Sequence, residues 1–127
     1  SEYCDKITEA PADHYPDRKL THNVPPYAEK FPYEIYEQLE HFISVVTRHP
    51  EAKILIESYT DSSGGARRNR QLSQLRADKV KEYFITQGID PARIKAIGLG
   101  EKDPITSNAT LAGRNINRRI EIELVRD

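Results

Sequence analysis

The feature that most constrains the fold is a strand, a long helix and a second strand, in that order, in the second half of the 127-residue chain. "KILIES", residues 53–58, is rich in aliphatic and β-branched residues, and a Ser/Gly loop follows it. Gly88 stands where a left-handed helix cap belongs, and "RIKAIG", residues 93–98, reads as the second strand. The helical stripe between them consists of Leu72, Leu75, Val80, Tyr83 and Phe84. Two strands joined by such a helix pair in parallel through a right-handed crossover.

Three further segments complete the expected α/β (α+β) fold. Apolar residues recur at helical spacing in 33–48, and Pro50 ends that helix. A short helix is expected around 110–115, with Asn108 or Thr110 as its cap. Apolar and charged residues alternate strictly in "RIEIELV", residues 119–125, as in a strand with one buried face. We therefore expect helices packed on a small mixed β-sheet.

We assign residues 1–32 to a Pro/Tyr-rich N-terminal extension and residues 33–127 to the domain. Five of the eight prolines lie in the extension, which shows little periodicity and predicts little regular structure apart from one short strand near "RKLTHNV". It also holds Tyr3, Tyr15 and Tyr27, more aromatic residues than a disordered tail usually carries. We expect an extended arm that lies on the domain or on a partner.

Composition excludes several classes of protein. Hydrophobic residues make up 37% of the chain and charged residues 31%, with both signs intermixed, which is typical of a globular domain. No apolar run approaches the roughly 18 residues of a membrane-spanning helix. The single cysteine, Cys4, cannot form an internal disulfide, and we interpret it as an incidental thiol rather than a lipid attachment point. Because the sequence contains no Met, we expect a processed or trimmed chain.

The charge pattern argues against nucleic acid as a partner. Residues 1–52 carry ten acidic and five basic side chains, whereas residues 53–127 carry ten acidic and fourteen basic ones. This mild excess suits anionic ligands but is too small and dispersed to indicate nucleic acid. RNA binding through "ARRNR" and "NRR" is disfavoured, since no aromatic stacking platform accompanies these arginines.

No arrangement of residues indicates an enzyme. Only Asp61 or Glu101 stands out as a general base, and neither has a convincing partner. There is no phosphate-binding loop, and the histidines lack metal-binding spacing. They are His14, His22, His41 and His49. We therefore predict no catalytic residue, no metal and no cofactor.

One acid and one arginine carry the predicted binding site. Asp61 falls just past the carboxyl end of the strand 53–58, where open α/β sheets place ligand contacts, although a plain turn residue is the competing interpretation. Arg76 lies on the apolar side of the next helix, a position that requires an anionic partner. The residues leave two alternatives open: a salt bridge between Asp61 and Arg76 that pins the loop to the helix, or a ligand that both of them bind.

Four segments together resemble a known family. "TDSSG", "NRQLSQLRADKV", "GLGEKDPITSNAT" and "GRNINRRIEI" are similar to motifs of the OmpA-like C-terminal domain, the peptidoglycan-binding module of Gram-negative envelope proteins, over about residues 33–125. The resemblance implies the βαβ sandwich of that family. It also implies that Asp61 and Arg76 clasp the diaminopimelate of the peptidoglycan stem peptide. The free end of diaminopimelate bears an ammonium beside a carboxylate, so its receptor needs one acceptor and one bidentate cationic donor.

The same resemblance extends the expected ligand-binding site beyond that pair. The further residues are Thr60, Ser62, Gly64, Asn69 and Arg118. Loop amides from 62 to 65 are expected to donate to the ligand carboxylate, while Asn69 braces the loop or contacts the ligand. For Arg118, as for Arg114 and Arg119, surface salt bridging and contact with ligand carboxylate or glycan are alternatives.

The resemblance implies a non-catalytic module that anchors an envelope protein to diaminopimelate-type peptidoglycan, from the periplasm and in association with the outer membrane. Any membrane anchor would lie outside this sequence. The alternative is an interaction subunit with a degenerate site, docked through its N-terminal arm into a larger envelope assembly such as a secretion system. Ser58 and Tyr59 replace the family's usual Gly-His, which leaves open whether Tyr59 partly fills the ligand groove and weakens binding.

Overall fold

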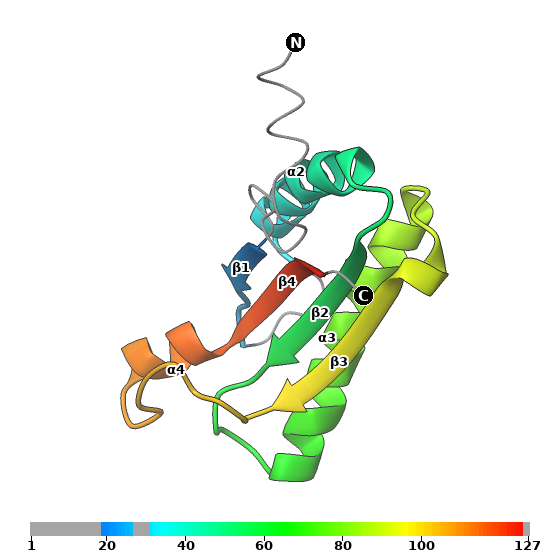
Figure 1. Cartoon of the computed structure of the whole chain (residues 1–127). Helices are drawn as coiled ribbons and strands as arrows, with labels where there is room; N and C mark the ends of the chain where they lie inside the picture. The colour runs from blue at the N-terminus through cyan, green and yellow to red at the C-terminus, as the bar shows by residue number, and fades with distance from the viewer. Residues whose placement is uncertain (1–18, 27–30, 126–127) are drawn as a thin grey trace.

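Strands and helices alternate through residues 19–26 and 31–125, the part of the chain that the computed structural model describes (Figure 1). Apart from one short 3₁₀ helix, which was not predicted, the order of these elements is the predicted one. They are β1 (Lys19–Asn23), α2 (Tyr33–Arg48), β2 (Lys53–Tyr59), α3 (Ala66–Thr86), the short 3₁₀ helix η1 (Pro91–Arg93), β3 (Ile94–Gly100), α4 (Leu111–Asn117) and β4 (Arg119–Val125). No helix among the described residues is long and apolar enough to cross a membrane.

The strands form one mixed sheet in the order β1-β4-β2-β3. β2 pairs in parallel with β3, as the strand–helix–strand pattern predicts, and β4 runs antiparallel to both β1 and β2. β2 is therefore a central strand, with Ile54 opposite Ile94 on one side and Leu124 on the other. The predicted small mixed sheet covered by helices is confirmed.

The core lies on the face of the sheet that α2 and α3 cover (Figure 1). Every second residue of β2 and β4 is fully buried in it, because side chains alternate between the faces of a strand. The two helices meet through Phe42 and Phe84, whose stacked ring centroids are 6.2 Å apart. Fully burying such a ring stabilises the fold by about 1.5–3 kcal/mol.

The N-terminal half of α3 departs from the predicted apolar stripe. Leu75 is 54% exposed, so its assignment to the buried stripe was wrong. The helix packs there against the backbone of β3: a Cβ added at Gly98 would lie 2.1 Å from the backbone nitrogen of Gln74. Ser73 Oγ accepts a hydrogen bond from the Gly100 amide at 2.9 Å. So close a contact accommodates small and polar side chains, and this half of the buried face therefore follows no apolar pattern. Val80 and Phe84 of the predicted stripe are buried further along the helix. The buried residues of the whole helix are Asn69, Ser73, Arg76, Ala77, Val80 and Phe84.

The expected short strand near residues 18–24 is confirmed by β1, which pairs with β4 over five residues. The sheet therefore reaches into residues 1–32, which were expected to form an extension. Residues 1–18 and 27–30, with the expected arm and its Tyr3, Tyr15 and Tyr27, lie outside the described residues. Thr110 caps α4 as predicted, since its Oγ1 accepts a hydrogen bond from the Gly113 amide at 3.0 Å.

Candidate functional site

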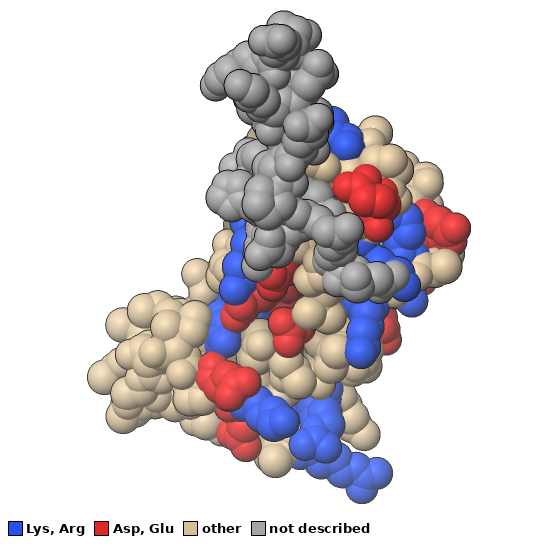
Figure 2. Space-filling model, viewed as in Figure 1, with Lys and Arg blue, Asp and Glu red and all other residues tan. Residues whose placement is uncertain are grey.

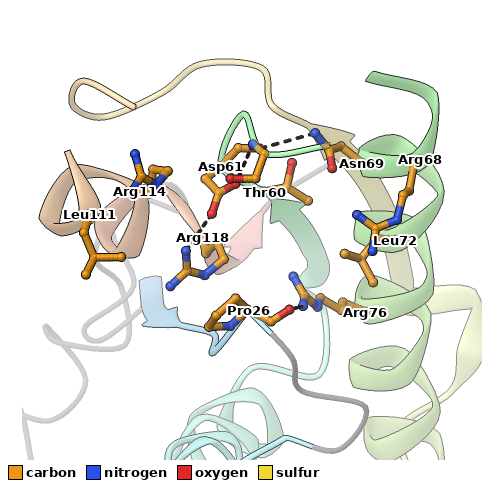
Figure 3. A pocket seen from close by; sticks show the side chains of 11 residues that line it. Pro26, Thr60, Asp61, Arg68, Asn69, Leu72, Arg76, Leu111, Arg114 and Arg118 are labelled. Atoms are coloured by element: carbon orange, nitrogen blue, oxygen red, sulfur yellow. Dashed lines mark hydrogen bonds and ion pairs between the residues drawn. The ribbon is translucent and has the colours of Figure 1, made fainter. Parts of the chain in front are cut away.

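A cavity of about 360 Å³ opens between α3 and α4, beside the carboxyl end of β2 (Figure 3). It brings together five of the seven predicted ligand-binding residues. These are Thr60, Asp61, Asn69, Arg76 and Arg118. Ser62 and Gly64 are not among the residues that line it, whereas Ser63 between them is. Pro26, Arg68, Leu72, Leu111 and Arg114 complete the lining.

The loop after β2 places Asp61 at the cavity. The Thr60 amide donates to the Gly100 carbonyl at 2.8 Å, which prolongs the pairing with β3 up to the loop. The Ser63 amide donates to Asp61 Oδ1 at 2.7 Å, a turn that a side-chain carboxylate closes. Gly64 has a φ of 84°, so a residue without a Cβ suits this turn. From the first turns of α3, the side-chain Nδ2 of Asn69 donates to the Asp61 carbonyl at 3.4 Å and braces the loop.

Asp61 forms a buried ion pair with Arg118, not with Arg76. Arg118 Nη1 lies 2.6 Å from Asp61 Oδ2, and each side chain is only 8% exposed. The guanidinium also donates to the Val24 carbonyl at 3.1 Å and to Asn115 Oδ1. The alternative of a salt bridge between Asp61 and Arg76 is therefore wrong, and so is surface salt bridging for Arg118. Burial by itself raises the pKa of Asp61, but hydrogen bonds from Arg118 and Ser63 outweigh it and hold that pKa below its ordinary value.

Arg76 is buried with most of its hydrogen-bonding capacity unused. The residue is 3% exposed, and its Nη2 makes only long contacts to the carbonyl oxygens of Pro25 and Pro26, at 3.4 and 3.5 Å. Its Nε and Nη1 have no hydrogen-bond partner within the described part of the chain. Burial and the positive charge of Arg118 lower the pKa of Arg76, while the charge of Asp61 offsets them in part. A buried cation with unused donors on a cavity wall is suited to an anionic ligand.

Tyr59 does not fill the cavity, so that alternative was wrong. Its ring lies on the other face of the sheet, below the Arg119 guanidinium, which is 3.8 Å from the ring centroid. Arg119 is in turn paired with Glu121 at 2.6 Å, and the Tyr59 hydroxyl donates to Glu57 at 3.4 Å. Arg119 is 3% exposed, so it is a buried partner of an aromatic ring and not a surface ion pair. The alternation of side chains along β2 separates Tyr59 from the ligand-facing side.

The buried phenol of Tyr59 predicts a loss of stability at alkaline pH. Burial, followed by the charges of Glu57 and Glu121, raises its pKa from 10.0 to about 12. The unfolded chain therefore releases this proton first, so the stabilisation is complete below pH 10 and is lost as the pH rises towards 12. The free energy of unfolding, measured with urea, should fall by about 2 kcal/mol more in the native protein than in Tyr59→Phe between about pH 9 and about pH 11.5. Parallel loss in both proteins would contradict this assignment.

Several lining residues were not predicted as ligand contacts. Arg68, Leu72 and Arg76 are four residues apart on α3, a spacing that places them on one side of a helix and would have revealed the first two. Pro26 and Leu111 carry no such signal, since they reach the cavity only through the tertiary fold. The described residues include no group of three or more His, Cys, Asp or Glu side chains arranged to hold a metal ion.

The model of the OmpA family matches residues 29–118 of the chain. Among curated proteins, the chain is 48% identical over 80 residues to the probable lipoprotein YiaD of Escherichia coli K12, covering 63% of this chain and 36% of that protein. It is 40% identical over 87 residues to the peptidoglycan-binding protein ArfA of Mycobacterium tuberculosis H37Rv, covering 68% and 27%. The chain thus spans about a third or less of these relatives.

A solved structure of similar fold is the peptidoglycan-associated lipoprotein from Burkholderia pseudomallei. It has a TM-score of 0.71 and 26% sequence identity, and the superposition covers 86% of this chain and 89% of that one. The two proteins therefore share a fold over most of the length of both chains.

Proposed function

The chain belongs to the OmpA family, and from this premise we propose that it binds peptidoglycan through the cavity between α3 and α4. In this role it anchors an envelope protein to the cell wall from the periplasmic side and catalyses no reaction. Support comes from the similar proteins named as peptidoglycan-binding or peptidoglycan-associated. The observation that carries the proposal is the unused hydrogen-bonding capacity of Arg76 on the wall of the cavity that Asp61 also lines.

The cavity suits the zwitterionic end of diaminopimelate. Arg76 offers Nε and Nη2 to the carboxylate as a planar fork, since Nε has no partner among the described residues and Nη2 makes only the contacts of 3.4 and 3.5 Å. Asp61 accepts one hydrogen bond on each carboxylate oxygen, from Ser63 and Arg118. Each oxygen has two lone pairs, so acceptor capacity remains for the ammonium. Thr60 Oγ1 is also buried without a hydrogen-bond partner among the described residues, and it adds a polar contact beside them.

Binding at one such site is weak. Charge-assisted hydrogen bonds contribute about 1.5–3 kcal/mol each, and ordering the ligand offsets part of that gain. A dissociation constant of about 10⁻³ to 10⁻⁵ M follows for a single stem peptide. Stable attachment then depends on many protein copies on one polymeric wall.

The electrostatics of Asp61 favour binding over catalysis. A general base works best when its pKa is near the working pH. The pKa of Asp61 is instead held below its ordinary value by Arg118 and Ser63. Asp61 is also the one carboxylate among the described residues that line the cavity. It therefore serves as a fixed negative charge.

We expect the protein to discriminate between two kinds of stem peptide. A lysine in place of diaminopimelate keeps the ammonium but lacks the carboxylate, so Arg76 stays unpaired. Isothermal titration with matched soluble fragments should give at least about tenfold weaker binding for the lysine form. Equal affinity for both fragments would contradict the proposed role of Arg76.

Co-sedimentation with purified diaminopimelate-type sacculi tests the proposal on the polymer. We expect Arg76→Ala to lower retention, whereas Arg67→Ala, which removes an exposed arginine outside the cavity on the same helix, leaves it unchanged. Retention that is identical in the native protein and Arg76→Ala would overturn the proposal.

One observation favours the alternative of an interaction subunit in a larger envelope assembly. The lobe formed by α4 and the loop before it presents a surface without acidic or basic side chains in Figure 2. Three large apolar side chains of α4 and the loop before it are exposed, Ile105 at 59%, Leu111 at 66% and Ile116 at 45%, and of these Leu111 also lines the cavity. Such a surface suits a protein partner. Under this alternative, retention on sacculi does not depend on Arg76.

A further inference from the structure

The cavity holds more positive charge than a single diaminopimelate can use. Among the described residues, four arginines and one carboxylate line it. The arginines are Arg68, Arg76, Arg114 and Arg118. Arg118 is neutralised by Asp61. The free end of diaminopimelate brings one ammonium and one carboxylate, a net charge of zero, so its binding leaves the excess of positive charge unchanged.

A hydrogen bond from its guanidinium to the backbone fixes Arg114 at the cavity. It lies in α4, is half-buried, and donates from Nη1 to the Asn108 carbonyl at 2.9 Å. This bond engages one of the three guanidinium nitrogens, and the fork geometry leaves the others available. An arginine that is already fixed loses less side-chain entropy when it binds a ligand.

The loop that carries Asn108 is itself rigidly placed. Asn117 is fully buried, and its Oδ1 accepts from the amides of Ile105 and Thr106 at 2.8 and 3.1 Å. Its Nδ2 donates to the Thr106 carbonyl and to Asn108 Oδ1, both at 2.8 Å. One asparagine thereby satisfies four groups of this loop. The carbonyl that positions Arg114 therefore belongs to an ordered frame.

Close packing of α4 on the same loop also fixes the position of Arg114. A Cβ added at Gly113 would lie 1.9 Å from the Ser107 carbonyl oxygen, so only glycine permits this approach. The residue next to Gly113 is Arg114, which is therefore set at a fixed distance from the loop.

Arg68 stands on the opposite wall, on α3 (Figure 3). It is exposed, and within the described ranges no ion pair to a carboxylate involves it. The two arginines therefore flank the cavity from α3 and α4, with the pair of Asp61 and Arg118 between them.

We propose that Arg114, assisted by Arg68 across the cavity, forms a second carboxylate-binding subsite. The ligand is then a stem peptide that carries a free carboxylate in addition to the one at the diaminopimelate end. This inference rests on the proposed function and deepens it, because it specifies the charge state of the ligand. Converting the second carboxylate to a carboxamide removes its charge and places an NH₂ donor against a cation.

The experiment compares two synthetic diaminopimelate-containing stem-peptide fragments that differ only in the second carboxylate, which is free in one and amidated in the other. Isothermal titration with the native protein should show about five- to tenfold tighter binding of the free form. In Arg114→Gln the two fragments should bind with nearly equal affinity, and the affinity for the amidated fragment should match that of the native protein. Arg67→Gln, an exposed arginine of α3 outside the cavity, should keep the native preference.

Each outcome separates the inference from the proposed function. Equal binding of both fragments by the native protein, with binding still dependent on Arg76, overturns the second subsite alone. A preference that persists unchanged in both Arg114→Gln and Arg68→Gln also overturns it. Failure of the native protein to bind either fragment overturns the proposed function and this inference together. Should Arg114→Gln unfold, the native comparison and Arg68→Gln decide the question.

Discussion

Replacing Asp61 with alanine should lower the free energy of unfolding by about 3–5 kcal/mol, the cost of leaving one member of a buried ion pair without its partner. Arg118 lies 2.6 Å from the carboxylate, and both side chains are 8% exposed, so solvent cannot replace the lost charge. Binding to sacculi should be lost as well. Urea unfolding and co-sedimentation measure the two effects, with Glu82→Ala, an exposed acid on α3, as the control.

A double variant separates folding from binding at this position. Replacing Asp61 by alanine and Arg118 by methionine removes both charges, so the combined loss of stability should be smaller than the sum of the single losses. Retention on sacculi should stay low. Additive single losses would show that the pair is not coupled.

Acid should also destabilise the native protein through this pair. Because the pKa of Asp61 is lowered in the folded state, the stabilisation is present above the unfolded value of 3.8 and is lost as the pH falls through the folded value.

Replacing Arg76 with methionine should have the opposite effect on stability. The arginine makes two contacts of 3.4 and 3.5 Å to proline carbonyls, and its Nε and Nη1 have no partner among the described residues. Removing a buried cation that is so poorly satisfied should leave the free energy of unfolding unchanged or raise it by about 1 kcal/mol. Peptidoglycan affinity should nevertheless fall by about 10- to 100-fold, because the ligand carboxylate loses its charged donor.

The comparison variant for this prediction is Arg67→Met, which makes the same substitution on an exposed residue of the same helix. It should bind and unfold like the native protein. A destabilisation of about 2 kcal/mol or more in Arg76→Met would assign the arginine to holding residues 25 and 26 in place, and unchanged affinity would remove it from the binding site.

Most of the fold could be predicted from local patterns. Strict alternation in 119–125 and the strand–helix–strand arrangement of 53–98 depend on periods that side-chain burial imposes, and both are confirmed by β4 and by the parallel pair β2 and β3. The prediction that Leu75 is buried was wrong, because α3 packs there on the backbone of β3 around Gly98. Hydrophobic periodicity cannot predict a contact that backbone and small polar groups make.

The sequence predicted part of the cavity lining, but it did not predict which arginine pairs with Asp61. Asp61 and Arg76 do reach one cavity, yet the ion pair of Asp61 is with Arg118, 57 residues away. Local spacing gives no information on which of several arginines a loop carboxylate will meet, because Arg118, between α4 and β4, reaches Asp61 only after the sheet is assembled. The orientation of Tyr59 could not be predicted for a similar reason. Its neighbour Ser58 faces the core and Tyr59 faces the other side of the sheet, and only the position of β2 in the sheet decides which of the two residues faces the core.

The direction of β1 has a mechanical consequence. Its last residue, Asn23, lies next to β4 where β4 begins, and Val24 is held by Arg118 at the cavity, while Lys19 lies at the far end of the strand. If the cavity grips a wall polymer and the preceding chain is pulled away, the load runs along the strand axis. The five registered residue pairs of β1 and β4 then bear the force in shear, all at once, rather than opening one after another like a zipper.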